Sequence, residues 1–435
     1  MKKFAADIYR WLRHLVRVGR GRWRLARQAR ALAAASGDWV ILLSLGRKGQ
    51  SQNVAREAVA QGFRVFVLCP EFPALEAPFM HGWRRVPGLN DIDTVRDFDG
   101  LVRDLQPLAP VAVLLEGKNL LLPAQTRLAR AFGLRPVGEK PTHASNSKIA
   151  MRQALEDADG AKLPWQEVTD TRAPITIPLP AIYKPDMGTA SKGVRLITSA
   201  EDLQREDVHD AAIAADISVG ERRLLEGFVK GRQFDMEGIA RDGRYLLLAC
   251  VEEYYEGRPP YFPPAWHYFN PPLGPALAER LDAAMNSSLS AVGVQDGAFH
   301  MEMRVDEAGN VYPLDYANRM GYNKLVSAAS GVSFAGSYVG VMTGTLALQD
   351  VVFDRRAILN VFCQDPRDMT RARDFRRRYP ENVFWFSPAP SHIGHTDIHG
   401  RITIIDDDHE AIVAKLEETG LLPPQFATFY GPEPR

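Results

Sequence analysis

Apolar positions follow a helical period at the start of the chain and strand-like runs after it. Residues 3–18 carry an apolar side chain every three to four positions with arginines between them, which predicts a basic amphipathic helix. From residue 38, two apolar runs of strand length, 39–45 and 64–68, flank a helical segment over 53–60. This order predicts a βαβ unit.

The same alternation continues and then changes character near Pro164. A strand over 111–115 and a helix over 123–132 predict a parallel sheet covered by helices, so residues 37–140 are expected to form a Rossmann-like domain. After a helix near 147–157, the remaining strands have hairpin spacing, and they cover 181–184, 194–197, 224–228, 234–240 and 245–251. The predicted fold class is therefore α/β and α+β.

Composition and charge narrow the class of protein. The 435 residues are 46% hydrophobic, and 53 basic side chains balance 53 acidic ones, so no net charge favours nucleic acid as a partner. The three cysteines, Cys69, Cys250 and Cys363, are far apart and fit a reducing cytoplasm better than a disulfide framework. No apolar stretch reaches the length of a membrane span.

Charge is distributed unevenly, because residues 1–36 hold ten basic side chains and one acid, Asp7. One interpretation is peripheral association of residues 1–30 with an anionic membrane or an acidic partner, with Phe4 and Trp11 entering the interface. The other interpretation is that the helix packs on the acidic remainder of its own chain. The sequence leaves both open.

A lysine followed by a loop of small residues is the most informative motif. Lys184 ends a predicted strand, and the loop to Val194 contains Gly188 and Gly193. Backbone N–H groups in such a loop can approach a phosphate closely while the lysine supplies positive charge, although an ordinary hairpin turn has the same composition. Lys148 lies about 36 residues earlier on a predicted helix, and the segment 224–231 follows about 42 residues later.

Two acidic residues on neighbouring predicted strands suggest a metal site. Glu302 lies in the segment 299–303, and Asp315 lies in 312–321 after a short turn. Paired carboxylates suit Mg²⁺ that bridges nucleotide phosphates.

The order and spacing of these segments resemble the ATP-grasp superfamily, in particular its biotin-carboxylase-like carboxylate–amine ligases. The resemblance implies a Rossmann-like domain followed by a two-lobed ATP-grasp module, with ATP and Mg²⁺ (or Mn²⁺) bound. Glu302 and Asp315 match the metal positions, with Asn318 as the third ligand, although Ala317 occupies the usual asparagine position and Gln233 replaces an acid that binds ribose. The resemblance implies that these residues bind ATP: Lys148, Lys184, Gly188, Thr189, Ala190, Ser191, Gly193, Val194, Glu226, Gly227, Phe228, Val229 and Gln233.

The resemblance also implies a reaction. Members activate a carboxylate as an acylphosphate, which an amine or thiol attacks, and they release ADP and phosphate. Lys184 and Arg319 are the expected catalytic residues. A kinase on the same fold and a nucleotide-binding protein without catalysis remain alternatives, and a biotin-dependent carboxylase ranks below them.

The substrates are indicated only in outline as a small carboxylate and an amine. An aromatic, proline-rich segment over 252–272 is expected to form a substrate wall, with Arg258, Trp266 and His267 as its contacts, although a structural cover over the sheet explains the same composition. A homodimer is compatible with the resemblance. The predicted boundaries are 1–36 for the basic helical segment, 37–140 for the Rossmann-like domain, 141–225 for the small lobe, 226–345 for the large lobe and 346–435 for a C-terminal extension.

Overall fold

The fold is taken from a computed structural model of the chain. It describes residues 37–45, 52–73, 76–188, 193–205, 222–255, 264–393, 396–423 and 426. The predicted amphipathic helix over 3–18 lies outside these residues, as do most of the loop after the first strand and the loop segments 189–192 and 256–263.

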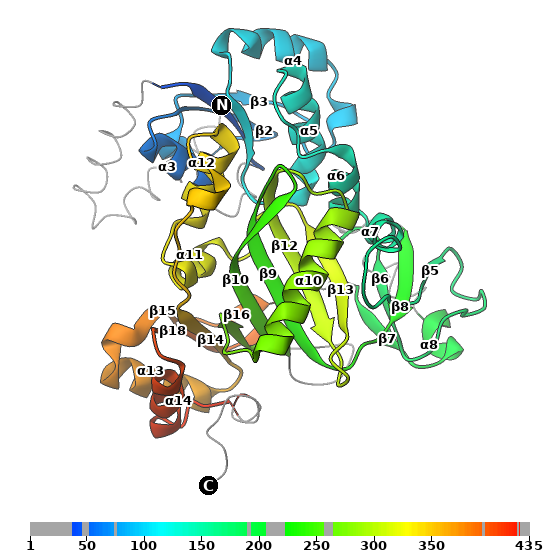
Figure 1. Cartoon of the computed structure of the whole chain (residues 1–435), viewed down its shortest axis with the longest axis vertical. Helices are drawn as coiled ribbons and strands as arrows, with labels where there is room; N and C mark the ends of the chain where they lie inside the picture. Colours follow the sequence, from blue (N-terminus) through cyan, green and yellow to red (C-terminus); the bar gives the residue numbers. More distant parts are fainter. Residues whose placement is uncertain are drawn as a thin grey trace.

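The N-terminal unit is a parallel sheet with helices on both faces, shown at the top of Figure 1. Strand order is β3-β2-β1-β4. Alternate residues of β1 face opposite sides, so Val40 and Leu42 pack with α3 and α12, whereas Ile41 and Leu43 pack with α4 and α5. The elements are β1 (Trp39–Leu43), α3 (Asn53–Ala60), β2 (Arg64–Cys69), β3 (Gly82–Arg85), α4 (Phe98–Leu105), β4 (Ala112–Leu115) and α5 (Leu122–Ala131).

A small four-stranded antiparallel sheet follows, in the order β5-β8-β6-β7. It is reached through two helices whose junction at Ser147 is capped by the serine side chain, which accepts from the Ala150 N–H. The elements are α6 (Glu139–Asn146), α7 (Lys148–Leu155), β5 (Trp165–Val168), β6 (Ala181–Pro185), β7 (Arg195–Ile197), α8 (Ala200–Gln204) and β8 (Arg223–Gly227).

The centre of the molecule is an eight-stranded antiparallel sheet in the order β13-β12-β9-β10-β11-β14-β18-β15. One face buries Phe299, Met301 and Met303 of β12 against α10. Because side chains alternate along a strand, His300 and Glu302 lie on the opposite face, which is polar here and apolar where α11 and α12 pack on it. The elements up to residue 343 are β9 (Arg232–Arg241), β10 (Arg244–Tyr255), β11 (Pro264–Phe269), α10 (Pro275–Ala291), β12 (Gly297–Val305), β13 (Val311–Ala317), α11 (Asn323–Ser330) and α12 (Phe334–Thr343).

The C-terminal segment extends this same sheet, and its strands β16 and β17 pair with each other in a separate two-stranded sheet. Three of its strands join the sheet, and α13 and α14 cover one face of them. These elements are β14 (Ala357–Cys363), α13 (Pro366–Arg378), β15 (Val383–Ser387), β16 (Ser391–Ile393), β17 (Thr396–Ile398), β18 (Gly400–Asp406) and α14 (His409–Glu418).

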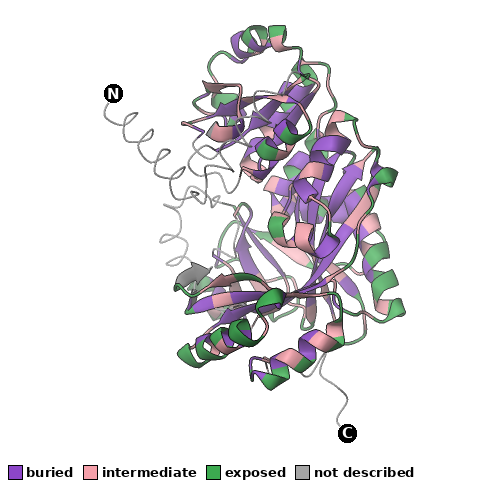
Figure 2. Cartoon of the chain, turned by 90° about the vertical axis from the view of Figure 1, so that its left-hand side faces the viewer, coloured by how far each residue is buried: buried purple, intermediate pink, exposed green. Residues whose placement is uncertain are grey.

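Burial follows these layers. Figure 2 shows buried residues concentrated in the sheets and exposed residues on the outward faces of the helices. Within the described part of the chain, no single helix has the length and apolar character needed to cross a membrane, and the apolar neighbours α11 and α12 meet at 93°. The predicted fold class is confirmed by this arrangement of a parallel sheet followed by antiparallel ones.

Candidate active site

The two predicted phosphate-binding lysines lie close to one of the predicted metal ligands. Lys148 begins α7, and its Nζ lies 3.4 Å from Oδ2 of Asp315 on β13 and 3.1 Å from the Gly188 carbonyl oxygen. Lys184 on β6 donates to the Leu314 carbonyl at 3.2 Å. Three elements that are distant in sequence therefore bring two cations to one carboxylate.

Lys184 is held in place by a buried ion pair. Its Nζ lies 2.6 Å from Oε1 of Glu226, and Arg152 on α7 lies 2.7 Å from the other carboxylate oxygen. Burial lowers the pKa of Lys184, and the charge of Glu226 opposes that effect. Burial alone would raise the pKa of Glu226, but Arg152 and Lys184 bring it below its ordinary value. Glu226 is therefore a carboxylate in this site.

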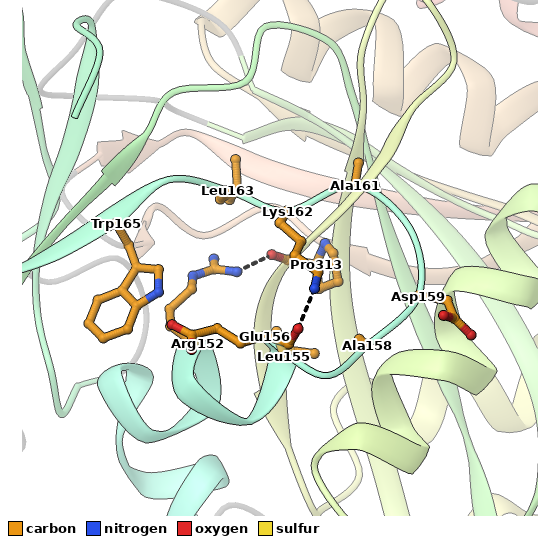
Figure 3. A pocket seen from close by; sticks show the side chains of 10 residues that line it. All are labelled: Arg152, Leu155, Glu156, Ala158, Asp159, Ala161, Lys162, Leu163, Trp165 and Pro313. Atoms are coloured by element: carbon orange, nitrogen blue, oxygen red, sulfur yellow. Dashed lines mark hydrogen bonds between the residues drawn. The ribbon is translucent and has the colours of Figure 1, made fainter.

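Arg152 also fixes the edge of β13. Its guanidinium donates to the carbonyl oxygens of Pro313 at 2.6 Å and Leu314 at 3.1 Å. Figure 3 shows it at the rim of a pocket of about 30 Å³ between α7 and the loop that leads to Trp165. That volume is about what one water needs, so this pocket is not large enough for a substrate.

Glu302 and Asp315 lie directly opposite each other on β12 and β13. Glu302 is also held by His300, whose Nε2 is 3.3 Å from Oε1 of Glu302, while the other ring nitrogen is 2.9 Å from Glu237. Burial alone would lower the pKa of His300, but Glu237 and Glu302 raise it well above its ordinary value, so the ring is cationic. Burial would likewise raise the pKa of Asp315, but Lys148 and Lys184 lower it.

This pair fits Mg²⁺ in one specific way. Among the described residues, no group of three or more histidine, cysteine or acidic side chains could ligate a metal by itself. Mg²⁺ is commonly held by one or two carboxylates together with water and substrate phosphates. Two facing carboxylates beside two lysines therefore fit a metal that arrives with a nucleotide.

A second acidic pair lies on the same face of the sheet, two strands from β13. Asp235 on β9 is opposite Glu302, and Glu253 on β10 accepts from the hydroxyls of Tyr255 and Tyr322. Burial and then the charge of Glu253 raise the pKa of Asp235 well above its ordinary value. Burial would also raise the pKa of Glu253, but His267 and the two hydroxyls lower it. Burial and the neighbouring charge thus favour the protonated form of Asp235, whereas the contacts of Glu253 favour its ionised form.

The other predicted nucleotide contacts border this face. Gly188 and Gly193 have φ angles of +152° and +71°, a region that favours glycine, at the two ends of the segment 189–192. Thr189, Ala190 and Ser191 lie outside the described residues, and Val194 follows Gly193 before β7. After Glu226, the Gly227 and Phe228 N–H groups donate to the carbonyl oxygens of Pro164 and Pro180, and the Val229 carbonyl accepts from Arg304. Gln233 donates to Glu253 at 3.2 Å and accepts from Arg304 at 2.5 Å.

Two sequence predictions about this region are wrong. Asn318 is 2% exposed, and its amide group contacts the Tyr316 hydroxyl and the Ala298 carbonyl. Since Tyr316 and Asn318 share one face of the chain while Asp315 lies on the other, Asn318 cannot join Asp315 as a ligand. Trp266 is fully buried and stacked on Tyr254, so it belongs to the core and does not form a substrate wall.

Other predicted residues have different outcomes. His267 is on the polar face, 3.5 Å from Glu253, and burial lowers its pKa. The Arg319 guanidinium donates to the neighbouring Met320 carbonyl at 3.0 Å, so the structure shows no contact between it and Asp315. Arg258 lies outside the described residues.

Comparison with known proteins agrees with this geometry. Residues 177–325 match a family described as the ATP-grasp domain. The chain contains an ATP-grasp domain.

Curated relatives match this chain over part of its length. An uncharacterised protein, y4rH, of Sinorhizobium fredii (strain NBRC 101917 / NGR234) is 27% identical over 226 residues, which are 50% of this chain and 46% of that protein. Carnosine synthase 1 of Mus musculus is 29% identical over 147 residues, which are 32% of this chain and 18% of that protein. The matched region thus spans less than half the length of either relative.

Solved structures share the fold beyond the ATP-grasp domain. An L-amino acid ligase from Bacillus licheniformis superposes with a TM-score of 0.69 at 17% identity, covering 88% of this chain and 97% of that one. The biotin carboxylase domain of Hydrogenobacter thermophilus 2-oxoglutarate carboxylase, solved with MgADP, ADP and bicarbonate, superposes with a TM-score of 0.61 at 16% identity, covering 87% and 89%. Likeness at these identities shows a common fold.

The face of the central sheet that holds Glu302 and Asp235 is called the ATP-grasp face below, and several of its residues were not predicted from the sequence. Asp235, Glu237, Glu253 and His300 are all at least nine-tenths buried. A signal was present, because polar and apolar residues alternate over 233–237 and again over 300–304. Such alternation predicts a strand with one polar face, and two such strands in one sheet place their polar residues together.

Proposed function

We propose that this protein is an ATP-dependent ligase that joins a small carboxylate to an amine. The observation that carries the proposal is the convergence of Lys148, Lys184, Glu302 and Asp315 at one edge of the ATP-grasp face. A site that only bound nucleotide would not need two facing carboxylates beside two lysines.

In the proposed first step, a carboxylate oxygen of the substrate attacks the γ-phosphorus of ATP, and the bond to the β-phosphate oxygen breaks to release ADP. Lys148 and Lys184 offset the negative charge of the phosphates. Mg²⁺, held by Glu302 and Asp315, would neutralise further phosphate charge when bound. Arg319 follows β13 and is the proposed contact for the transferred phosphoryl group.

In the proposed second step, the amine nitrogen attacks the acylphosphate carbonyl carbon, and phosphate leaves with its electron pair. The attacking nitrogen must lose a proton. The proposed proton acceptor is the Asp235–Glu253 pair on β9 and β10, through its ionised member Glu253. Gly188, whose carbonyl oxygen accepts from Lys148, begins the loop to Gly193 that we propose as the cover that limits hydrolysis.

The test is a mass-resolved assay of the full chain with ATP, Mg²⁺, pooled carboxylic acids and pooled amines. The expected result is ADP, phosphate and a product whose mass equals acid plus amine minus water. Glu302→Ala should abolish it, whereas Glu307→Gln, which alters an exposed acid in the β12–β13 turn, should not. ADP together with a phosphorylated product would mean a kinase, and bound but unchanged ATP with every pool would refute the ligase.

A further inference from the structure

The polar face of the eight-stranded sheet continues well past the residues assigned to ATP. Directly paired residues of antiparallel strands lie on the same face of a sheet. One such row crosses seven strands from β12 to β15, and it contains Arg304, Gln233, Glu253, His267, Asn360, Thr403 and Trp385. The face that holds Glu253 is thus the face that holds Trp385.

Aromatic rings connect the two ends of this row. Glu302 and Asp315 are called the metal pair below. The ring of Tyr322 lies 6.1 Å from the ring of His300, which is beside this pair, and 5.4 Å from the ring of His267. His267 in turn lies 4.8 Å from Phe362 on β14. Phe362 is paired with Arg401 on β18, so the ring contacts lead from the metal pair to a cation.

Two cations converge on Trp385 at the far end. The Arg401 guanidinium lies 4.2 Å from the ring centroid, and the Lys324 ammonium, carried on α11, lies 5.6 Å from it. Trp385 is 39% exposed and Arg401 is half-buried, so solvent reaches the group. No ion pair to an acid is found for either cation among the residues that the structure describes. Partial burial lowers the pKa of Arg401.

The end of the row beside the metal pair carries acidic side chains. Two buried carboxyl groups, those of Asp235 and Glu253, lie at this end, and Oδ1 of Asp235 has no hydrogen-bond partner among the described residues. An amine nitrogen is a donor and suits this end, whereas the cations Arg401 and Lys324 suit an anion. The row therefore has carboxyl groups near the metal pair and the cations Arg401 and Lys324 at its far end.

We propose that Arg401, Lys324 and Trp385 form a subsite for an anionic group at the far end of the amine substrate. This inference rests on the proposed ligase function. Three strand spacings separate β10 from β18, about 14 Å. Arg401 lies two residues along β18 from Thr403, which is in register with Glu253, and both side chains shorten the separation, so we take about five to eight bonds between amine and anion as the substrate length. The substrate class is an elongated amine with a terminal carboxylate or phosphate.

The test measures binding without requiring turnover. Three probes of one length, 6-aminohexanoate, 6-aminohexyl phosphate and the neutral 6-aminohexanamide, are titrated by calorimetry into the full chain saturated with MgADP. Both anionic probes are expected to bind at least about tenfold more tightly than the amide, because each gains a charge-assisted hydrogen bond. A preference between carboxylate and phosphate identifies the natural anion.

Variants locate the subsite. Arg401→Gln should remove the advantage of the anionic probes and leave the amide unchanged, and Arg401→Lys should restore part of it. Arg376→Gln is the matched control, since Arg376 lies 4.9 Å from the ring of Phe386 on the other face of β15. Equal binding of all three probes to the natural chain, no binding of any, or equal effects of Arg401→Gln and Arg376→Gln would overturn the subsite.

The subsite and the ligase proposal can fail separately. If Arg401 determines probe binding but no pool of acids and amines yields a condensed product, the subsite stands and the ligase does not. If condensation occurs equally well with the anionic amines and the amide, and Arg401→Gln changes the KM of neither kind of amine, the ligase stands and the subsite does not.

Discussion

Replacing Glu226 with glutamine tests whether the lysine cluster works as the structure implies. The carboxylate lies between Lys184 at 2.6 Å and Arg152 at 2.7 Å. In Glu226→Gln the side chain keeps its size but loses the charge that opposes the effect of burial on the pKa of Lys184. Lysine is charged below its pKa and neutral above it, so the variant should lose the Lys184 charge as pH rises.

The expected magnitude follows from a single contact. A hydrogen bond to a charged group is worth about 1.5–3 kcal/mol, which is about 10- to 100-fold in affinity. Calorimetric titration of ADP in the presence of Mg²⁺ should therefore show that the affinity of Glu226→Gln falls by this factor as the pH rises from 6 to 9. The natural chain and Glu167→Gln, which alters an exposed acid paired with Arg222 on the same small sheet, should show a much flatter profile.

The variant must also be shown to be folded. Removing one member of a buried ion pair costs about 3–5 kcal/mol of stability, so the midpoint of thermal unfolding is recorded for each variant at each pH. If folded Glu226→Gln binds ADP with the same pH dependence as the natural chain, the role assigned to Lys184 is refuted.

Three further predictions concern the neighbouring residues. Glu302→Gln and Asp315→Asn should each lower Mg²⁺-dependent ADP release at least about 100-fold, and retention of release in either variant would remove that residue from the metal site. Trp266→Ala should cost about 3–5 kcal/mol in urea unfolding without changing a substrate KM, whereas a raised KM at unchanged stability would restore its substrate role. His300 has a raised pKa in the folded state, so its contribution to stability is full below the ordinary histidine pKa and is lost as pH rises through the folded value. His300→Gln should flatten the decline of the urea midpoint on the alkaline side, and an unchanged slope would contradict the assigned charge.

The sequence predicted those parts of the site that depend on order along the chain. Lys148, Lys184, Glu302 and Asp315 were found because each lies in a short segment with a characteristic neighbour, and the structure brings the first two beside Asp315. The parallel sheet was predicted because buried strands and helices alternate in sequence, and local periodicity suffices to detect them.

Other parts depend on which face of a strand a residue occupies. Asn318 was assigned to the metal site from its position in a motif, but the direction of its side chain is set by the alternation that begins at Asp315. The Arg152–Glu226 pair joins residues 74 positions apart, and no local pattern signals it. The pairing of β14 and β18 with β11 likewise places Arg401 on the ATP-grasp face, although it is more than 80 residues beyond Arg319.

The polar part of the central sheet contributes to stability differently from the apolar face under α10. The face under α10 buries large apolar side chains, each of which stabilises the fold by about 1.5–3 kcal/mol. On the other face, Asp235 Oδ1, Arg304 Nε and both ring nitrogens of His267 are buried without a hydrogen bond to any described residue, and such groups cost about 1–3 kcal/mol each.

A ligand that supplies partners to those atoms should recover part of this cost. Ligand at 100 times its Kd stabilises the folded state by about 2.7 kcal/mol through mass action alone, whichever contacts it makes. If the polar face is the binding face, MgADP and an anionic amine added together should raise the unfolding temperature more than the sum of their separate effects, since each would order the face for the other. Strictly additive shifts would mean that the nucleotide and the amine bind at uncoupled places, and the continuous polar row would then have a structural role only.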